Sequence, residues 1–398
     1  MNIKNGLICV LIIAILAASV PNVAVAATSN YSTTFHNCAR HTSDYRPVAG
    51  GNTSNDILNW KFAANGSVTP SATFYGTVYV GSCDNNVYAL NARTGEKVWS
   101  YATGNLVRSC PAVSNGIVYF GSDDRNVYAL NARTGEKVWS YTTGSIVHCS
   151  PAVSNGIVYV GSYDHNFYAF DARTGEKVWS YTTGCIVACS PTVANGIVYT
   201  GSDDHNVYAL DANTGTKIWS YATKSDVWST PVIVNGIVYI GSWDGNVYAL
   251  DANTGTKIWS YATERFAHVS PTVANGIVYV GCWNGNVYAL NARTGEKVWN
   301  YTARGIVHSA PVVANGIVYV GSEDRNIYAI NAKTGMKIWN YTTGSNVHAS
   351  PTVANGIVYA GSWDGNVYAL DANTGTKIWS YATRGIVWSS PAIANGIG

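Results

Sequence analysis

Short apolar runs alternate with turn-forming residues along most of the chain. In one stretch the runs cover residues 106–113, 116–122, 126–132 and 137–142, and short polar segments rich in Gly, Asn and Asp separate them. β-Branched and aromatic residues in runs of this length are typical of strands, and Asn-Gly or Thr-Gly between them is typical of hairpin turns. No segment has the 3.6-residue period of an amphipathic helix. The pattern therefore predicts an all-β chain of hairpin-connected strands.

This pattern repeats every 40 residues from residue 81 onward. Tryptophan marks the same place in each copy: Trp99, Trp139, Trp179, Trp219, Trp259, Trp299, Trp339 and Trp379. Each copy holds four predicted strands, which is the content of one propeller blade. Because a single blade cannot bury its two faces alone, the blades are expected to pack around a ring. We predict an eight-bladed β-propeller of four-stranded antiparallel blades over residues 57–398.

The two ends of this region carry extra strand sequences. Residues 57–63 are similar to a fourth strand, and residues 386–394 are similar to a ninth first strand. The first strand of the first blade, residues 68–74, departs from the repeat, because Ser71 replaces the usual Pro and Phe74-Tyr75 replaces Asn-Gly. We therefore predict that the C-terminal strand competes with or replaces residues 68–74 as the innermost strand of the first blade. A truncated gene product is the alternative explanation of the abrupt end.

Residues 1–26 are predicted to be a signal peptide. Lys4 gives a basic start, residues 7–20 form an apolar core, and Ala24-Val25-Ala26 matches a cleavage site. The core is shorter than the roughly 20 residues of a membrane span, although an uncleaved anchor is the alternative. No cysteine follows the core as a lipid anchor would require. We expect residues 27–56 to form a linker, and the mature protein to be secreted or held in the cell envelope without stable membrane insertion.

Charge and cysteine content narrow the classes of function. The net charge is +2, and Lys and Arg form no cluster, so nothing supports a nucleic acid partner. Seven cysteines follow the signal segment: Cys38, Cys83, Cys110, Cys149, Cys185, Cys189 and Cys282. An odd number at irregular spacing does not indicate a disulfide framework, so we expect most of them to be small apolar fillers.

A motif precedes the tryptophan of each copy. Residues 169–179 read A-F-D-A-R-T-G-E-K-V-W, and residues 209–219, 249–259 and 369–379 share the pattern A-x-D-x-x-T-G-x-x-x-W. This pattern resembles the tryptophan-docking motif of the pyrroloquinoline quinone (PQQ)-like repeat propellers, which include the quinoprotein alcohol dehydrogenases and the outer-membrane assembly-factor lipoproteins. Asn, which also caps turns, replaces the Asp in the other four copies: Asn91, Asn131, Asn291 and Asn331. The motif implies that each Trp presents a large apolar face to the next blade.

The resemblance raises the alternative of a PQQ-dependent dehydrogenase. Such a site implies an adjacent Cys-Cys pair, Ca²⁺ held by carboxylate and amide oxygens, and a catalytic Asp, but the chain has no Cys-Cys pair and no insertion into the blade pattern. One Asp recurs in the turn between the second and third strands, and we interpret it as a turn cap rather than a metal ligand. It occurs in seven copies: Asp84, Asp124, Asp164, Asp204, Asp244, Asp324 and Asp364. We therefore expect no enzymatic activity and no PQQ, Ca²⁺ or other cofactor.

Two positions differ strongly among otherwise similar copies. Just before the first strand stand Arg108, His148, Ala188, Trp228, His268, His308, His348 and Trp388. In the turn after the second strand stand Cys83, Asp123, Tyr163, Asp203, Trp243, Trp283, Glu323 and Trp363. In a four-stranded meander both positions lie at the same end of the blade, so they should share one face of the disc and its central mouth.

Aromatic, His and Arg side chains at a concave mouth are typical of a binding surface. The predicted ligand-binding residues are Arg108, His148, Trp228, Trp243, His268, Trp283, His308, His348, Trp363 and Trp388. Sequence drift at solvent-exposed positions is the alternative explanation. We expect His268, His308 and His348 to lie too far apart to bind one metal ion, because they belong to separate blades.

These observations predict an exported, non-catalytic and monomeric binding or scaffold protein of the cell surface or envelope. Its partner is expected to be a protein or a glycan. A PQQ-dependent dehydrogenase and a structural component of a surface layer are the alternatives.

Overall fold

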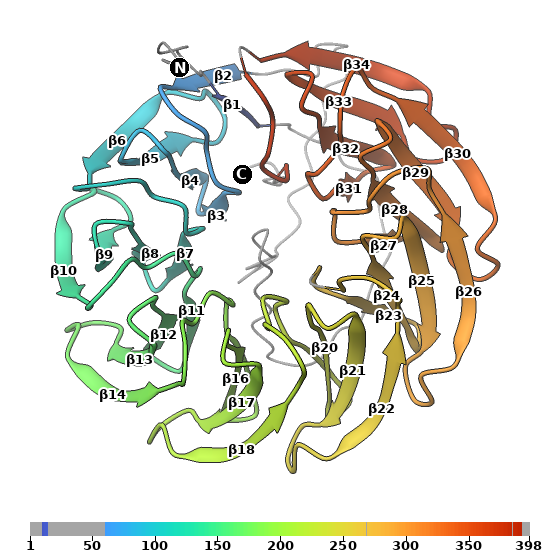
Figure 1. The fold of residues 1–398 in the computed structure, drawn as a ribbon. Helices are drawn as coiled ribbons and strands as arrows, with labels where there is room; N and C mark the ends of the chain where they lie inside the picture. The colour runs from blue at the N-terminus through green and yellow to red at the C-terminus, as the bar shows by residue number, and fades with distance from the viewer. Residues whose placement is uncertain (1–9, 15–59, 268, 384, 392–398) are drawn as a thin grey trace, which may run out of the picture.

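The computed structural model describes residues 10–14, 60–267, 269–383 and 385–391, and within them eight antiparallel sheets stand around a common centre (Figure 1). Each sheet has four strands in sequence order, with the first strand innermost and the fourth at the rim. The predicted all-β, eight-bladed propeller is confirmed. In the described part of the chain no helix is long and apolar enough to cross a membrane.

From the innermost to the outermost strand, the first four blades are β3 (Ala72–Phe74), β4 (Thr77–Gly81), β5 (Asn86–Asn91) and β6 (Lys97–Ala102); β7 (Ala112–Ser114), β8 (Ile117–Gly121), β9 (Asn126–Asn131) and β10 (Lys137–Thr142); β11 (Ala152–Ser154), β12 (Ile157–Gly161), β13 (Asn166–Asp171) and β14 (Lys177–Thr182); and β15 (Thr192–Ala194), β16 (Ile197–Gly201), β17 (Asn206–Asp211) and β18 (Lys217–Ala222). The last four are β19 (Val232–Val234), β20 (Ile237–Gly241), β21 (Asn246–Asp251) and β22 (Lys257–Ala262); β23 (Thr272–Ala274), β24 (Ile277–Gly281), β25 (Asn286–Asn291) and β26 (Lys297–Thr302); β27 (Val312–Ala314), β28 (Ile317–Gly321), β29 (Asn326–Asn331) and β30 (Lys337–Thr342); and β31 (Thr352–Ala354), β32 (Ile357–Gly361), β33 (Asn366–Asp371) and β34 (Lys377–Ala382).

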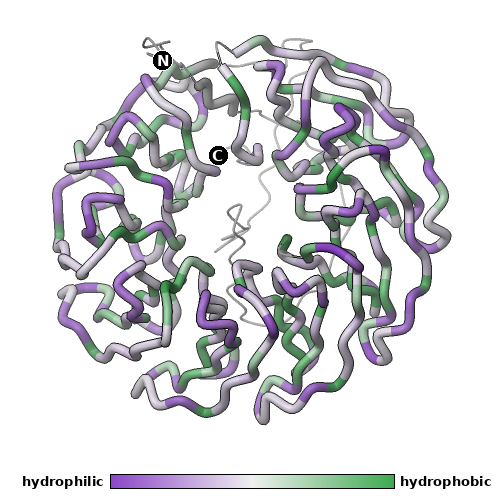
Figure 2. Tube along the Cα trace, in the orientation of Figure 1, coloured by the Kyte–Doolittle hydropathy of each residue, from purple (hydrophilic) through white to green (hydrophobic). Residues whose placement is uncertain are grey.

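Burial within a blade follows the hydropathy of its strands. The two middle strands are buried on both faces, whereas the outer strand is mostly exposed apart from its buried Trp. Hydrophilic and hydrophobic residues accordingly mix along the rim in Figure 2. The innermost strand is shorter than predicted: in the second blade it covers residues 112–114, whereas the expected run was 106–113. Pro111 has no N–H to donate, and Val107 N donates to Ser82 O of the preceding blade, so this segment connects blades.

Neighbouring blades are joined through the repeated tryptophan. Trp99 Nε1 of the first blade donates to the carbonyl of Ala132 in the second blade at 2.9 Å, and the hydroxyl of Tyr79 donates to the same carbonyl at 3.0 Å. Gly135 of the second blade, with φ +75°, lies against the indole, and a Cβ there would come within 2.6 Å of Trp99 Cδ2. Only glycine fits this turn, which explains the Thr-Gly of the motif.

The same indole-to-carbonyl bond joins the next six pairs of blades at 2.9–3.0 Å: Trp139–Ala172, Trp179–Ala212, Trp219–Ala252, Trp259–Ala292, Trp299–Ala332 and Trp339–Ala372. The resemblance implied that each Trp packs on the following blade, and these contacts confirm it.

The first blade departs from the prediction. Its innermost strand is β3, which pairs with β4, so the expectation that a C-terminal strand takes this place is wrong. Tyr75 and Gly76, and not Phe74 and Tyr75, take the place of Asn-Gly: with φ 41° and 74° they form the turn that Asn115 and Gly116 form in the second blade with φ 49° and 74°. Residues 392–394 of the proposed competing strand lie outside the described residues.

The extra N-terminal strand is present as β2 (Trp60–Ala64), but it pairs with β1 (Val10–Ala14) in a separate two-stranded sheet. Phe62 and Ala64 pack against the core of the first blade, and the rings of Phe62 and Tyr88 lie 5.0 Å apart. The assignments of residues 1–26 to a signal peptide and of 27–56 to a linker stay predictions.

The described cysteines behave largely as expected. Cys149, Cys189 and Cys282 are buried free thiols, and Cys83 and Cys185 are half-buried and free. Cys110, in contrast, is disulfide-bonded, which its spacing in the sequence did not indicate.

The hydrogen bond from Trp to the next blade predicts that the same Trp-to-Phe substitution lowers the free energy of unfolding by different amounts at two positions. Trp219→Phe removes the bond to Ala252 and is expected to lower the free energy of unfolding by about 1–3 kcal/mol, since a buried carbonyl loses a donor and the indole packing is reduced. Trp379→Phe is the matched control, because the Nε1 of Trp379 has no hydrogen-bond partner among the described residues, and a loss below about 1 kcal/mol is expected. Urea unfolding measures both, and equal losses would contradict the role of the bond.

Candidate functional site

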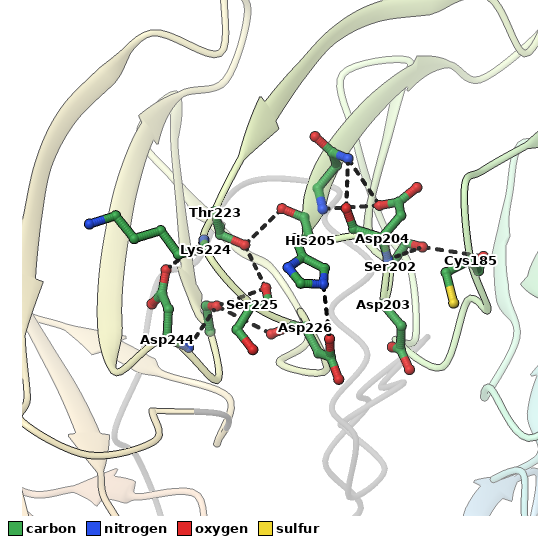
Figure 3. Close-up of polar contacts among 12 residues, drawn as sticks. Cys185, Ser202, Asp203, Asp204, His205, Thr223, Lys224, Ser225, Asp226 and Asp244 are labelled. Carbon is green, nitrogen blue, oxygen red and sulfur yellow. Dashed lines mark hydrogen bonds and ion pairs between the residues drawn. The ribbon is translucent and has the colours of Figure 1, made fainter.

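The connection into each blade holds the two variable positions side by side. In the second blade, Asp123 N donates to Leu106 O at 2.8 Å, while Val107 N reaches Ser82 O of the first blade at 3.1 Å. The connection therefore runs between the turn of its own blade and the turn of the preceding blade. Figure 3 shows the equivalent connection into the fifth blade, where Thr223 Oγ1 donates to the carbonyls of His205 and Ser225, both at 2.7 Å.

Because of this arrangement, a turn residue can contact variable residues of two successive connections, as Trp243, Trp283, Glu323 and Trp363 do. We call the resulting row of side chains the variable belt. The belt consists of the described variable residues that contact one another: Arg108, Asp123, His148, Tyr163, Asp203, Trp228, Trp243, Phe266, Trp283, His308, Glu323, His348, Trp363 and Trp388. The structure thus brings the two predicted positions together at one end of the blades. His268 lies outside the described residues.

The belt is polar beside the second and third blades. Arg108 Nε lies 3.4 Å from Asp123 Oδ2, and the carboxylate is far more buried than the guanidinium. Burial raises the pKa of Asp123, and the charge of Arg108 opposes that shift. His148 Nδ1 lies 3.1 Å from the hydroxyl of Tyr163, and burial, followed by the nearby Arg108, lowers the pKa of His148 to about 4. His148 is therefore neutral at pH 7.

Asp203 marks the change from the polar to the aromatic half. Its Oδ1 accepts a 2.7 Å hydrogen bond from Trp228 Nε1. Burial raises the pKa of Asp203 to about 6, against the opposing effect of this bond. Asp226, whose Oδ1 lies 3.6 Å from His205 Nε2, adds a like charge nearby (Figure 3).

A row of rings continues from Trp228 across the fifth to eighth blades. The separations of successive ring centroids are 5.1 Å for Trp228–Trp243, 5.6 Å for Trp243–Trp283, 5.1 Å for Trp283–His308, 4.5 Å for His308–His348, 4.1 Å for His348–Trp363 and 4.3 Å for Trp363–Trp388. Phe266 fills the space beside Trp243 and Trp283, at 4.8 and 5.1 Å. Trp388, at the end of the row, is 49% exposed.

The expectation that these histidines stand too far apart to share a metal ion is wrong for His308 and His348. Their imidazoles stack, and Glu323 Oε1 lies 3.7 Å from His308 Nε2 and 3.1 Å from His348 Nε2. The two histidines do belong to separate blades, but the connections that carry them converge on the turn of the seventh blade. Burial lowers the pKa of both histidines, to about 4 for His348, and raises that of Glu323.

The repeated Asp caps its turn, as interpreted from the sequence. Asp164 Oδ1 accepts from Asn166 N at 2.9 Å, and its Oδ2 accepts from the hydroxyl of Tyr168 at 2.7 Å and from Gly144 N at 2.6 Å. Corresponding bonds engage the other six carboxylates of the set, at Asp84, Asp124, Asp204, Asp244, Asp324 and Asp364.

Five belt residues were not among the predicted ligand-binding residues although they complete its contacts. The variable turn position holds four of them, Asp123, Tyr163, Asp203 and Glu323, and Phe266 stands where other copies have Leu, Ile, Asp or Asn. This third variable position, two residues before the one chosen, is the signal that could have revealed Phe266.

Comparison with known families agrees with the repeat. A family profile described as outer membrane protein assembly factor BamB matches residues 47–185, 183–305 and 302–394, which together cover most of the chain. The chain belongs to the BamB family. A search of curated protein sequences finds no match.

Solved structures share the fold of this BamB-family chain. BamB from Moraxella catarrhalis is 22% identical, with a TM-score of 0.64 over 73% of this chain and 92% of that one. The computationally designed protein Ika8 is 21% identical, with a TM-score of 0.64 over 78% and 95%. A quinohemoprotein alcohol dehydrogenase from Pseudomonas putida HK5 is 17% identical, with a TM-score of 0.61 over 75% and 69%. At these identities the likeness establishes the fold alone.

The raised pKa of Asp203 predicts a specific pH dependence. The carboxyl ionises near pH 3.8 in the unfolded state and near pH 6 in the folded state. Between these values the folded state binds more protons than the unfolded state, so the protein loses stability as pH rises from about 4 to 6. Asp203→Asn cannot ionise, and its stability relative to the native protein should therefore increase across this window. Thermal melts at pH 4, 5, 6 and 7 measure the difference.

Asp171→Asn is the control of opposite sign. Hydrogen bonds, first from the backbone N–H of Thr174, lower the pKa of Asp171, so the native protein should gain stability over this variant as pH rises toward 4, which melts extended to pH 2 and 3 measure. Asn131 occupies the same turn in the second blade, so the substitution fits the fold. A pH-independent difference for Asp203→Asn would contradict the assignment.

Proposed function

We propose that this protein is an exported, non-catalytic binding scaffold whose variable belt contacts a protein partner in the cell envelope or at the cell surface. The observation that carries the proposal is the row of rings from Trp228 to Trp388. It spans four blades at one end, while the turns at the opposite end repeat almost unchanged. Trp and Tyr dominate the energetic centres of protein interfaces, and His308 and His348 add polar atoms that fix orientation.

The family supports a protein rather than a glycan partner. Its description names an outer membrane protein assembly factor, which is a role in handling other proteins at an envelope membrane. The apolar segment and small-residue site within residues 1–26 support export. A monomeric chain with one belt suffices for this function.

The donor chemistry does not fit a PQQ and Ca²⁺ pair. Ca²⁺ takes six to eight oxygen ligands, whereas the repeated aspartates are already engaged in capping their turns. Among the described residues, the one group of three or more potential metal ligands contains two imidazoles. We therefore do not propose a dehydrogenase, and dye reduction in the presence of PQQ and Ca²⁺ is the result that would reveal one.

A pair of variants tests the role of the belt. Trp388→Ala removes the most exposed ring of the row. The substitution is expected to weaken partner binding at least about tenfold, because a Trp side chain that becomes buried in an interface contributes strongly to the binding free energy. Met336→Glu is the control: Met336 is 70% exposed in the Thr-Gly turn at the opposite end, where Glu96, Glu136, Glu176 and Glu296 stand in other copies. Partners captured from an envelope extract are identified, and their affinities for both variants are measured.

The outcomes separate the alternatives. Equal binding by the native protein and Trp388→Ala would contradict the proposal and favour a structural surface-layer component. Belt-dependent binding on a glycan array, without a protein partner, would support the belt as the binding surface but show that its partner is a glycan and not a protein. Dye reduction with alcohols or sugars after addition of PQQ and Ca²⁺ would overturn the non-catalytic assignment.

A further inference from the structure

Two imidazoles and one carboxylate converge where the seventh and eighth blades meet. His308 precedes β27, Glu323 follows β28, and His348 precedes β31. One ligand atom of each lies within 4.8 Å of those of the other two, and the three side chains are only 23%, 27% and 12% exposed. In the part of the chain that the structure describes, no other group of three such side chains comes together in this way.

Aromatic neighbours hold the two imidazoles in place. Trp283 lies 5.1 Å from His308 on one side, and Trp363 stacks on His348 at 4.1 Å on the other. The four rings form one column, with the Nε2 atoms of both histidines near the same Glu323 oxygen. These contacts place both histidines in a packed row of rings beside Glu323.

We propose that His308, Glu323 and His348 form a binding site for a divalent transition-metal ion of the zinc type. Imidazole nitrogen and carboxylate oxygen are ligands that Zn²⁺ prefers, and two donors on one tetrahedral Zn²⁺ lie about 3.3–3.5 Å apart. The observed separations from Glu323 Oε1, 3.7 and 3.1 Å, lie on either side of this range. Three protein ligands leave one position open for water.

The ligand rings need one local adjustment. The imidazole planes stand 16° from parallel, whereas a bound metal lies in the plane of each ring. Both rings must therefore rotate about their Cβ–Cγ bonds to turn their lone pairs toward the ion, which alters their packing against Trp283 and Trp363. The flanking indoles Trp283 and Trp363 then report on metal entry.

This inference does not depend on the proposed partner binding, because metal affinity is measured on the isolated full chain. The protein is purified without a histidine tag, stripped with a chelator and titrated with ZnCl₂ by calorimetry. One ion per chain is expected. Co²⁺ serves as a spectroscopic probe, with visible bands of a low-coordinate nitrogen and oxygen site and quenching of tryptophan fluorescence.

Glu323→Gln and His348→Asn are expected to weaken Zn²⁺ binding by more than the roughly 10–100-fold that loss of an outer-shell partner costs. His165→Asn is the matched control. His165 lies in a turn of the third blade with φ 70°, and Asn85 holds the same turn of the first blade with φ 70°, so this variant should bind Zn²⁺ like the native protein.

Three results would overturn the site: no Zn²⁺ bound by the native chain, unchanged affinity in Glu323→Gln, or a Co²⁺ spectrum with the intense near-ultraviolet band of thiolate ligation. Circular dichroism checks the fold of each variant. If His348→Asn fails to fold, the nearly isosteric Glu323→Gln decides the question.

Discussion

The hydrogen bond from a tryptophan Nε1 to an alanine carbonyl of the following blade is the contact on which the propeller depends. It recurs at seven junctions with a sequence separation of 33 residues, and the same carbonyl also accepts from a buried Tyr hydroxyl. The glycine that lies on the indole fixes how closely the blades approach. Because these contacts lie near the rim and in the blade core, the connections and turns at the other end can differ in side chain without loss of the fold.

The junction after the eighth blade differs from the other seven. Trp379 Nε1 has no hydrogen-bond partner among the described residues, and the described core around Tyr359 and Ala369 includes no residue of another blade. At the other side of this junction, Phe62 and Ala64 of β2 cover the first blade. Among the described residues, seven equivalent joints and one distinct seam therefore hold the propeller together. The aromatic row of the variable belt ends at Trp388 beside this seam.

The 40-residue period was sufficient to predict the blades and their four strands, and the resemblance carried by the Trp motif implied the Trp packing, because each depends on contacts that recur in every copy. The predictions failed where one copy differs or where contacts cross between blades. Tyr75-Gly76 keeps the hairpin of β3 although it lacks the usual Asn. The approach of His308 to His348 depends on how two connections converge on Glu323, and a period along the chain does not specify that convergence. The binding residues themselves stay predictions.

Hydrogen exchange of the indole N–H groups, followed by NMR on tryptophan-labelled protein, tests the central claim most directly. The account predicts that seven indoles, from Trp99 to Trp339 in the repeat, exchange slowly because each is buried and bonded to the next blade. Trp379 should exchange faster, and Trp388, which is half exposed, fastest. Exchange of the seven joint indoles as fast as that of Trp388 would contradict the claim that these bonds hold the ring together.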